Sequence, residues 1–147
     1  DAGMRGMAAA RAIGLLTYRG SEGYNLTQQE LDDKVRYSDF RACTYQSYQG
    51  EKLCRRFDAY SYMTILDTFD THDVGRNRGG VDSALGRVTA RCLVVGITTD
   101  IIFTPKEMRE LSSKIKNSIY KEIISEFGHD GFLVEHEQLN KLIMPFM

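Results

Sequence analysis

The chain lacks a strong charge bias, a long apolar run and a paired set of cysteines. Its 147 residues carry 19 basic and 20 acidic side chains, so we expect neither a nucleic acid nor an anionic membrane as partner. No apolar segment approaches the roughly 20 residues of a membrane-spanning helix, and no charged-then-apolar leader opens the chain. The three cysteines have no metal-ligand spacing, which predicts free thiols in a reducing cytoplasm and no metal site.

Helical spacing of apolar residues dominates the first eighty positions. Residues 4–18 are rich in alanine and place apolar side chains at helical intervals. Thr27 and Glu30 form a capping-box pattern, which predicts a second, polar helix through about Val35. Helical spacing returns over 45–70, with Asp58 as a natural cap inside it, and the glycine-rich segment 73–80 predicts a loop.

The pattern changes near residue 81. A short helix is expected at about 81–86, and the unbroken apolar run Cys92–Ile97 is typical of a parallel strand buried on both faces. The segment Thr104–Glu107 combines a cap, a proline and a glutamate, and marks a helix start. A second strand is expected at about 120–124, with one more helix after it. Strand, helix, strand, helix predicts a parallel crossover, so the fold class is α/β.

A two-stranded parallel sheet cannot cover its own faces and edges. The expected strands are too apolar to face water, so we expect further sheet from a segment upstream. The chain also opens without an initiator methionine, as a fragment or a processed product would.

Two side chains with possible chemistry follow the two expected strands. Asp100 comes just after the first strand and His129 just after the second. The carboxyl ends of parallel strands meet at one edge of the sheet, where α/β proteins bind ligands. A carboxylate there can hold the Nδ1–H of an imidazole and leave Nε2 as a general base. In the simpler alternative, neither residue is catalytic: Asp100 only ends a strand, and His129 is a surface residue of a turn.

Several segments resemble the homoserine O-acetyltransferases, enzymes of the α/β-hydrolase fold. Leu93–Phe103 resembles their segment around the catalytic aspartate, and Gly128–Leu133 followed by Glu135 resembles their catalytic-histidine segment. Tyr60 and Thr104 depart from the usual pattern. The other matches lie in the helical part: Leu15–Arg19, His72–Arg76, and the segment from Gln49-Gly50 through Arg56–Tyr62, which resembles part of their helical lid. The resemblance implies a helical lid and dimerisation region over 1–80, and the C-terminal part of an α/β-hydrolase core over 81–147.

The resemblance also implies a ping-pong acetyl transfer from acetyl-CoA to L-homoserine, a step of methionine biosynthesis. His129 would be the base and Asp100 its orienter. The nucleophilic serine of such enzymes lies in a Gly-x-Ser-x-Gly elbow, which this sequence lacks. Ser21 has the wrong spacing, so we assign no nucleophile and expect the chain alone to be inactive. The N-terminal half of the same enzyme would supply the serine.

Substrate contacts are likewise implied by the resemblance. Arg56 would grip the homoserine carboxylate, a task suited to a guanidinium fork. Tyr62 and Asp130 would help to hold the amino acid, with Asp130 facing its ammonium group. Acetyl-CoA would be the acyl-donor substrate, no cofactor would stay bound, and the lid helices would form a homodimer. From the residues alone, a solvated helix arginine is the favoured interpretation of Arg56, and a core side chain is that of Tyr62.

Two alternatives stay open. One is a homoserine succinyltransferase or another amino-acid O-acyltransferase, since the walls that choose the acyl donor lie near the absent nucleophile. The other is a non-catalytic helical dimerisation module with a degenerate α/β tail. A Gly-x-Ser-x-Gly pattern upstream of this chain would favour an enzyme.

Overall fold

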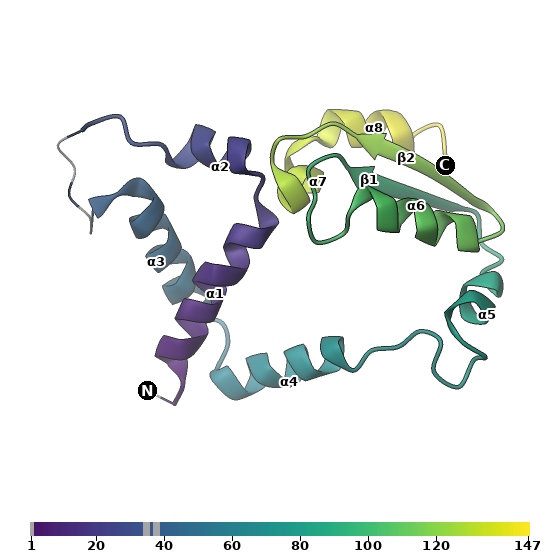
Figure 1. Ribbon diagram of the computed structural model, residues 1–147, viewed down its shortest axis with the longest axis horizontal. Helices are drawn as coiled ribbons and strands as arrows, with labels where there is room; N and C mark the ends of the chain where they lie inside the picture. Colours follow the sequence, from purple (N-terminus) through teal and green to yellow (C-terminus); the bar gives the residue numbers. More distant parts are fainter. Residues whose placement is uncertain (1, 34–35, 37–38) are drawn as a thin grey trace. The chain divides into compact units, whose positions relative to one another are not determined.

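A computed structural model describes residues 2–33, 36 and 39–147 (Figure 1). The chain forms two compact units. The first spans Glu22–His72 together with the chain up to Thr17, and the second spans Tyr18–Ser21 together with Asp73–Met147. The assignment of 1–80 as lid and 81–147 as core stays a prediction. The elements are α1 (Met4–Tyr18), α2 (Ser21–Gln28), α3 (Arg41–Cys54), α4 (Ala59–Asp70), α5 (Val81–Gly86), β1 (Cys92–Ile97), α6 (Pro105–Lys114), β2 (Ser118–Ile123), η2 (Gly128–Asp130), α7 (Gly131–Val134) and α8 (His136–Ile143).

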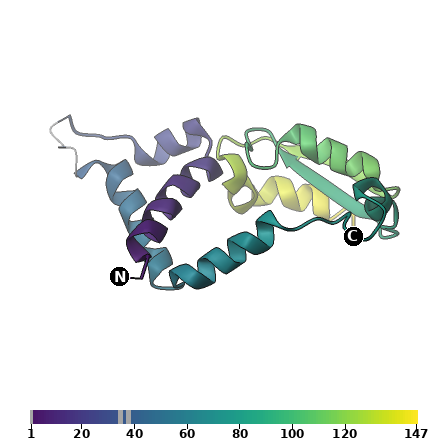
Figure 2. The ribbon, with the colours of Figure 1, turned by 60° about the horizontal axis from the view of Figure 1, so that its bottom comes forward.

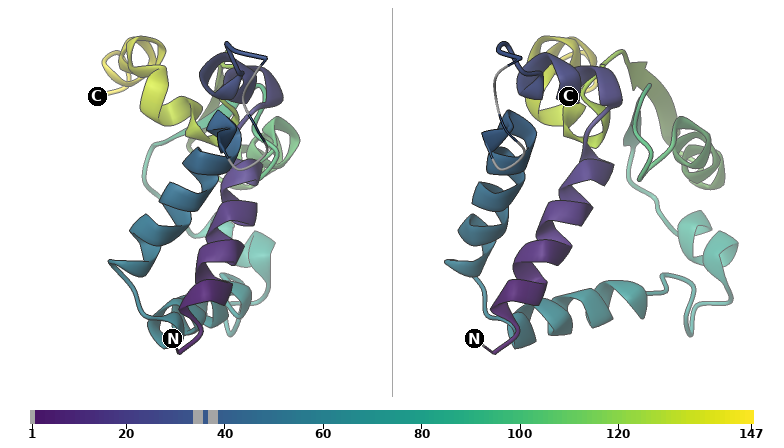
Figure 3. Two further views of the ribbon diagram at one scale, coloured as in Figure 1. Left: turned by 90° about the vertical axis from the view of Figure 1, so that its left-hand side faces the viewer. Right: turned by 60° about the vertical axis from the view of Figure 1, so that its left-hand side comes forward.

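The first unit is built on the packing of α1 against α3. The two helices run side by side (Figure 3), and their close approach depends on Gly50, because a Cβ there would come within 2.8 Å of the Ala8 carbonyl oxygen. Met7 and Leu15 on α1 are buried. The helix predicted over 4–18 is confirmed.

The second helix was predicted in the wrong place. α2 ends at Gln28, and the Thr27 hydroxyl donates to the Gly23 carbonyl one turn earlier, so Thr27 lies in the last turn of a helix and does not cap a new one. The Glu30 carboxylate accepts from the backbone N–H of Arg41, a contact that local spacing does not reveal. The predicted end near Val35 lies outside the described residues.

The segment predicted to be helical over 45–70 forms two helices, α3 and α4. α3 begins at Arg41, earlier than predicted, and the break before α4 falls at the predicted cap. Asp58 accepts from the backbone N–H of Ser61 at 2.8 Å and from its hydroxyl at 2.7 Å. These hydrogen bonds lower the pKa of Asp58.

The second unit contains a parallel pair of strands. β1 and β2 pair in register from Cys92 opposite Ser118 to Ile97 opposite Ile123. β2 therefore begins two residues before the predicted 120, because its first residues pair with β1. Ile97 and Ile123 are buried in this core. α6 and α8 lie on opposite faces of the strands (Figure 2), as expected of a parallel crossover.

The start of α6 has the predicted capping box. The Thr104 hydroxyl accepts from the Glu107 N–H at 3.3 Å, and the Glu107 carboxylate accepts from the Thr104 N–H at 3.0 Å. α6 packs on both strands. This packing fixes the position of the loop 98–104, which connects β1 to α6. Across the described ranges, no helix has both the length and the apolar character needed to cross a membrane.

Candidate active site

Asp100 and His129 meet beyond the carboxyl ends of the two strands. β1 ends at Ile97 and β2 at Ile123, so both side chains reach the same edge of the sheet. The distance from Asp100 Oδ2 to His129 Nδ1 is 2.8 Å. The Asp100 side chain is only 3% exposed, whereas that of His129 is 25% exposed. The predicted proximity is confirmed, and the histidine is the member of the pair that reaches solvent.

The Asp100 carboxylate is fixed by backbone donors. Its Oδ1 accepts from the N–H of Ile102 at 2.8 Å and from that of Phe103 at 3.0 Å. Oδ2 is thereby directed at His129. A carboxylate is an acceptor, so in the neutral imidazole this contact assigns the proton to Nδ1 and leaves a lone pair on Nε2. This is the tautomer that a general base requires.

Among the described residues, three aromatic rings lie around the His129 imidazole. The ring centroid of Phe103 lies 5.3 Å away, that of Phe132 5.6 Å and that of Tyr18 5.9 Å. These are ordinary distances for tilted and edge-on aromatic contacts. They restrict rotation of the imidazole about its side-chain bonds, which keeps Nδ1 on Asp100.

The loop that carries His129 is tied to the end of β1. The Thr99 hydroxyl donates to the Ser125 carbonyl at 2.7 Å and accepts from the Gly128 N–H at 3.0 Å. The Thr98 hydroxyl accepts from the Ser125 N–H at 3.1 Å. Gly131 packs on the Ser125 side chain, where a Cβ would come within 2.9 Å of its Oγ. The two strand ends therefore hold the pair as one rigid arrangement.

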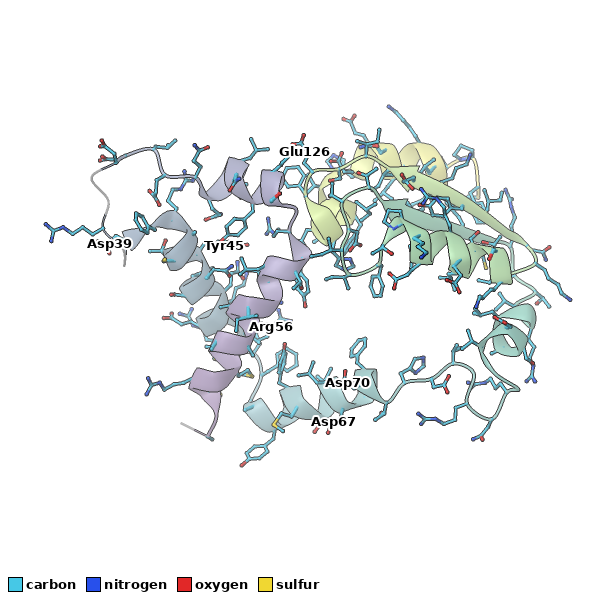
Figure 4. The ribbon with its side chains drawn as sticks, viewed as in Figure 1. Asp39, Tyr45, Arg56, Asp67, Asp70 and Glu126 are labelled. Atoms are coloured by element: carbon cyan, nitrogen blue, oxygen red, sulfur yellow. The ribbon has the colours of Figure 1, made fainter. Side chains whose placement is uncertain are left out.

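The proposed substrate contacts divide between the two units. Asp130 adjoins His129, and its Oδ2 forms an ion pair with Arg19 Nε at 2.6 Å. Arg56 belongs to the first unit and is exposed (Figure 4), with its guanidinium 5.7 Å from the Phe57 ring. Tyr62 is half-buried, and its ring lies 6.5 Å from that of Phe57. The substrate-binding roles of Arg56, Tyr62 and Asp130 stay predictions.

Sequence reasoning missed the residues that surround the histidine. Arg19 and Thr99 were not singled out, nor were the rings of Tyr18, Phe103 and Phe132. All of them lie inside the segments that resemble the acetyltransferases, so membership of those segments was the available signal. Among the described residues, no three His, Cys, Asp or Glu side chains gather as metal ligands.

The chain is similar to curated enzymes along almost its whole length. It is 42% identical over 146 residues to a homoserine O-acetyltransferase of Cyclobacterium marinum, covering 99% of this chain and 41% of that protein. It is 42% identical over 147 residues to the homoserine O-acetyltransferase of Thermus thermophilus, covering 97% of this chain and 36% of that protein. The chain thus spans about two fifths of the length of the curated relatives it matches. No protein-family model matches it.

Solved structures show the same fold. A homoserine O-acetyltransferase from Bacillus anthracis matches with a TM-score of 0.84 at 17% identity, over 99% of this chain and 42% of that one. Esterase E22 matches with a TM-score of 0.81 at 13% identity, over 99% of this chain and 42% of that one. The fold is that of the C-terminal part of an α/β-hydrolase. A homoserine O-acetyltransferase from Staphylococcus aureus matches at 29% identity with a TM-score of 0.68, over 92% of this chain and 38% of that one. The resemblance to homoserine O-acetyltransferases that the motifs predicted is confirmed.

Proposed function

We propose that this chain supplies the histidine and aspartate of an acyltransferase that moves an acetyl group from acetyl-CoA to the hydroxyl of L-homoserine. The observation that carries the proposal is the 2.8 Å contact between His129 Nδ1 and Asp100 Oδ2 at the ligand-binding edge of the strands. The similarity to enzymes of that name supports the choice of substrates.

The reaction proceeds in two steps, each with His129 as the proton carrier. A serine from the rest of the protein attacks the thioester carbonyl, and Nε2 takes the serine proton. The carbon–sulfur bond then breaks, and the coenzyme A sulfur leaves with that proton. In the second step, Nε2 removes the proton of the homoserine hydroxyl, whose oxygen attacks the acetyl-serine. The serine oxygen leaves and regains the proton. Asp100 stabilises the imidazolium that forms in both steps.

Recognition of homoserine completes the proposal. Arg56 binds the substrate carboxylate through its guanidinium, and Tyr62 helps to hold the amino acid. Asp130 takes the ammonium group. Its Oδ2 faces Arg19, which leaves Oδ1 for that contact.

The rest of the enzyme and a second copy are the expected partners. A nucleophile-bearing N-terminal half would cover β1 and β2, where the apolar residue Ile119 of β2 is 43% exposed. Exposed apolar surface on a helix is a common feature of interfaces, and we propose that α4 contributes to a homodimer. The exposed apolar side chains of α4 are those of Tyr60, Met63, Ile65, Leu66 and Phe69. The cytoplasm is the proposed location, since Cys43, Cys54 and Cys92 are all free.

The central test uses the enzyme in which this chain is joined to its nucleophile-bearing part. Replacing His129 by Ala removes the base of both steps, so release of coenzyme A and formation of O-acetylhomoserine should both fall to background. His136→Ala is the matched control, because His136 is exposed at the start of α8, and it should keep full activity. Near-normal turnover in His129→Ala would sink the mechanism.

Donor and acceptor selectivity are read from the same preparation. Acetyl-CoA and succinyl-CoA are compared as donors, with homoserine, serine and water as acceptors. Preferred use of succinyl-CoA would replace the acetyl assignment, and efficient transfer to water alone would make the protein an esterase. Failure to release coenzyme A from any donor would favour the non-catalytic dimerisation module.

A further inference from the structure

A short segment near the start of the chain crosses the turn that carries His129. A Cβ on Gly20 would collide with the carbonyl oxygen of Glu126, which lies in the loop after β2 (Figure 4). Gly128 has a φ of +62°, and a Cβ there would come within 2.5 Å of the Gly20 nitrogen. The two backbones therefore touch at a pair of glycines, and neither position has room for a side chain.

The neighbours of Gly20 reach the other members of that turn. The ring of Tyr18 lies 5.9 Å from that of His129. Arg19 Nε lies 2.6 Å from Asp130 Oδ2, and the two side chains are only 22% and 18% exposed. The turn Gly128–Asp130 is thus held at its first residue by backbone contact and at its last by an ion pair.

We propose that Arg19 is a positioning residue for His129, acting through the carboxylate of Asp130. His129 lies between the two anchored ends of the turn. Its Nδ1 must stay 2.8 Å from Asp100 Oδ2, and its Nε2 must face the reacting atoms. Release of Asp130 lets the end of the turn move, and the imidazole moves with it. A displacement of about 1 Å at a reacting group is enough for a large loss of rate.

This role rests on the proposed function and predicts that Arg19 affects the acylation step. Acylation by acetyl-CoA precedes the arrival of homoserine, so a residue that only binds the amino acid leaves acylation unchanged. A residue that orients His129 affects both steps by the same factor, because His129 carries the proton in each.

The experiment measures both half-reactions in Arg19→Gln by rapid mixing. We expect acylation and transfer to homoserine each to slow roughly tenfold, the scale of a partly buried ion pair. Arg19→Lys keeps a cation beside Asp130 and should recover most of the rate. In an Asp130→Asn background, Arg19→Gln should have little further effect. Arg109→Gln breaks another 2.6 Å ion pair, with Glu122, on a more exposed surface, and should leave both steps unchanged.

A spectroscopic readout keeps this inference separate from the proposed function. The Nδ1 proton of His129, held by Asp100, should give a slowly exchanging NMR signal that broadens in Arg19→Gln and persists in Arg109→Gln. If the parent enzyme releases no coenzyme A while this pattern holds, the function is wrong and the positioning role stands. Normal acylation and an unchanged Nδ1 proton signal in Arg19→Gln would overturn the positioning role, as would a full Arg19→Gln effect in the Asp130→Asn background.

Discussion

Replacing Asp100 by Asn is the sharpest perturbation of the proposed catalytic pair. The side-chain oxygen of Asn can still accept from the N–H groups of Ile102 and Phe103, which contact Oδ1 at 2.8 and 3.0 Å. Its amide nitrogen then takes the place of Oδ2 and presents a donor to His129 Nδ1. His129 Nδ1 must then accept this hydrogen bond with its lone pair. The imidazole proton therefore moves to Nε2, which can no longer act as a general base.

The magnitudes of the two consequences differ widely. Turnover should fall about 10⁴-fold, the loss found when a triad aspartate becomes asparagine, which corresponds to about 5.5 kcal/mol in the activation barrier. Stability should fall by only about 1 kcal/mol, since the size is unchanged and the backbone hydrogen bonds survive. Asp100→Ala, in contrast, leaves two N–H donors without acceptors and should destabilise the loop as well.

The assay pairs coenzyme A release with urea unfolding and with ¹⁵N NMR of the imidazole. Asp73→Asn is the matched control: Asp73 accepts from the Gly75 N–H at 2.7 Å in the loop before α5, and its replacement should leave turnover unchanged. Turnover of Asp100→Asn within tenfold of the parent enzyme would refute the tautomer argument. So would a proton that stays on Nδ1 in an inactive variant.

Four further outcomes follow from the same structure. Arg56→Ala should raise the KM for homoserine at least tenfold and leave acylation by acetyl-CoA unchanged, and stopped-flow acylation that slows as much as turnover would contradict this division. Thr104→Ala should lower the free energy of unfolding by about 1 kcal/mol through loss of the α6 cap, as read from urea denaturation. The hydrogen bonds from Thr104 hold the pKa of Glu107 below its ordinary value of 4.5. The ionised Glu107 carboxylate therefore contributes to stability above pH 4.5, and this contribution is lost as the pH falls through the lowered pKa. Glu107→Gln should lack this part of the acid sensitivity of unfolding. Light scattering of the complete enzyme should give a dimer, with Met63→Glu and Phe69→Glu on α4 shifting it toward monomer; a monomer at micromolar concentration would exclude the proposed interface.

Features set by neighbours in the chain were predictable from the sequence. The capping box of Thr104 and Glu107, the Asp58 cap and a strand over Cys92–Ile97 all appear in the structure at the predicted positions. Burial of that strand on both faces was wrong for this chain, because only Gly96 and Ile97 are buried. The two caps depend on contacts within a few residues, and the strand on a continuous apolar run, and residue type alone reports both. The meeting of Asp100 with His129 was also predictable, because two parallel strands must end at one edge.

Contacts between distant parts of the chain were decided only by the tertiary structure. The capping pattern at Thr27 failed because Glu30 accepts from Arg41, a partner that no local pattern identifies. The sequence determined an α/β unit with an acid and a histidine at one edge of its strands. Tertiary packing brought Gly20 against Gly128 and Arg19 against Asp130. A Cβ at either glycine would overlap the other segment's backbone, and which two glycines meet depends on the whole path of the chain.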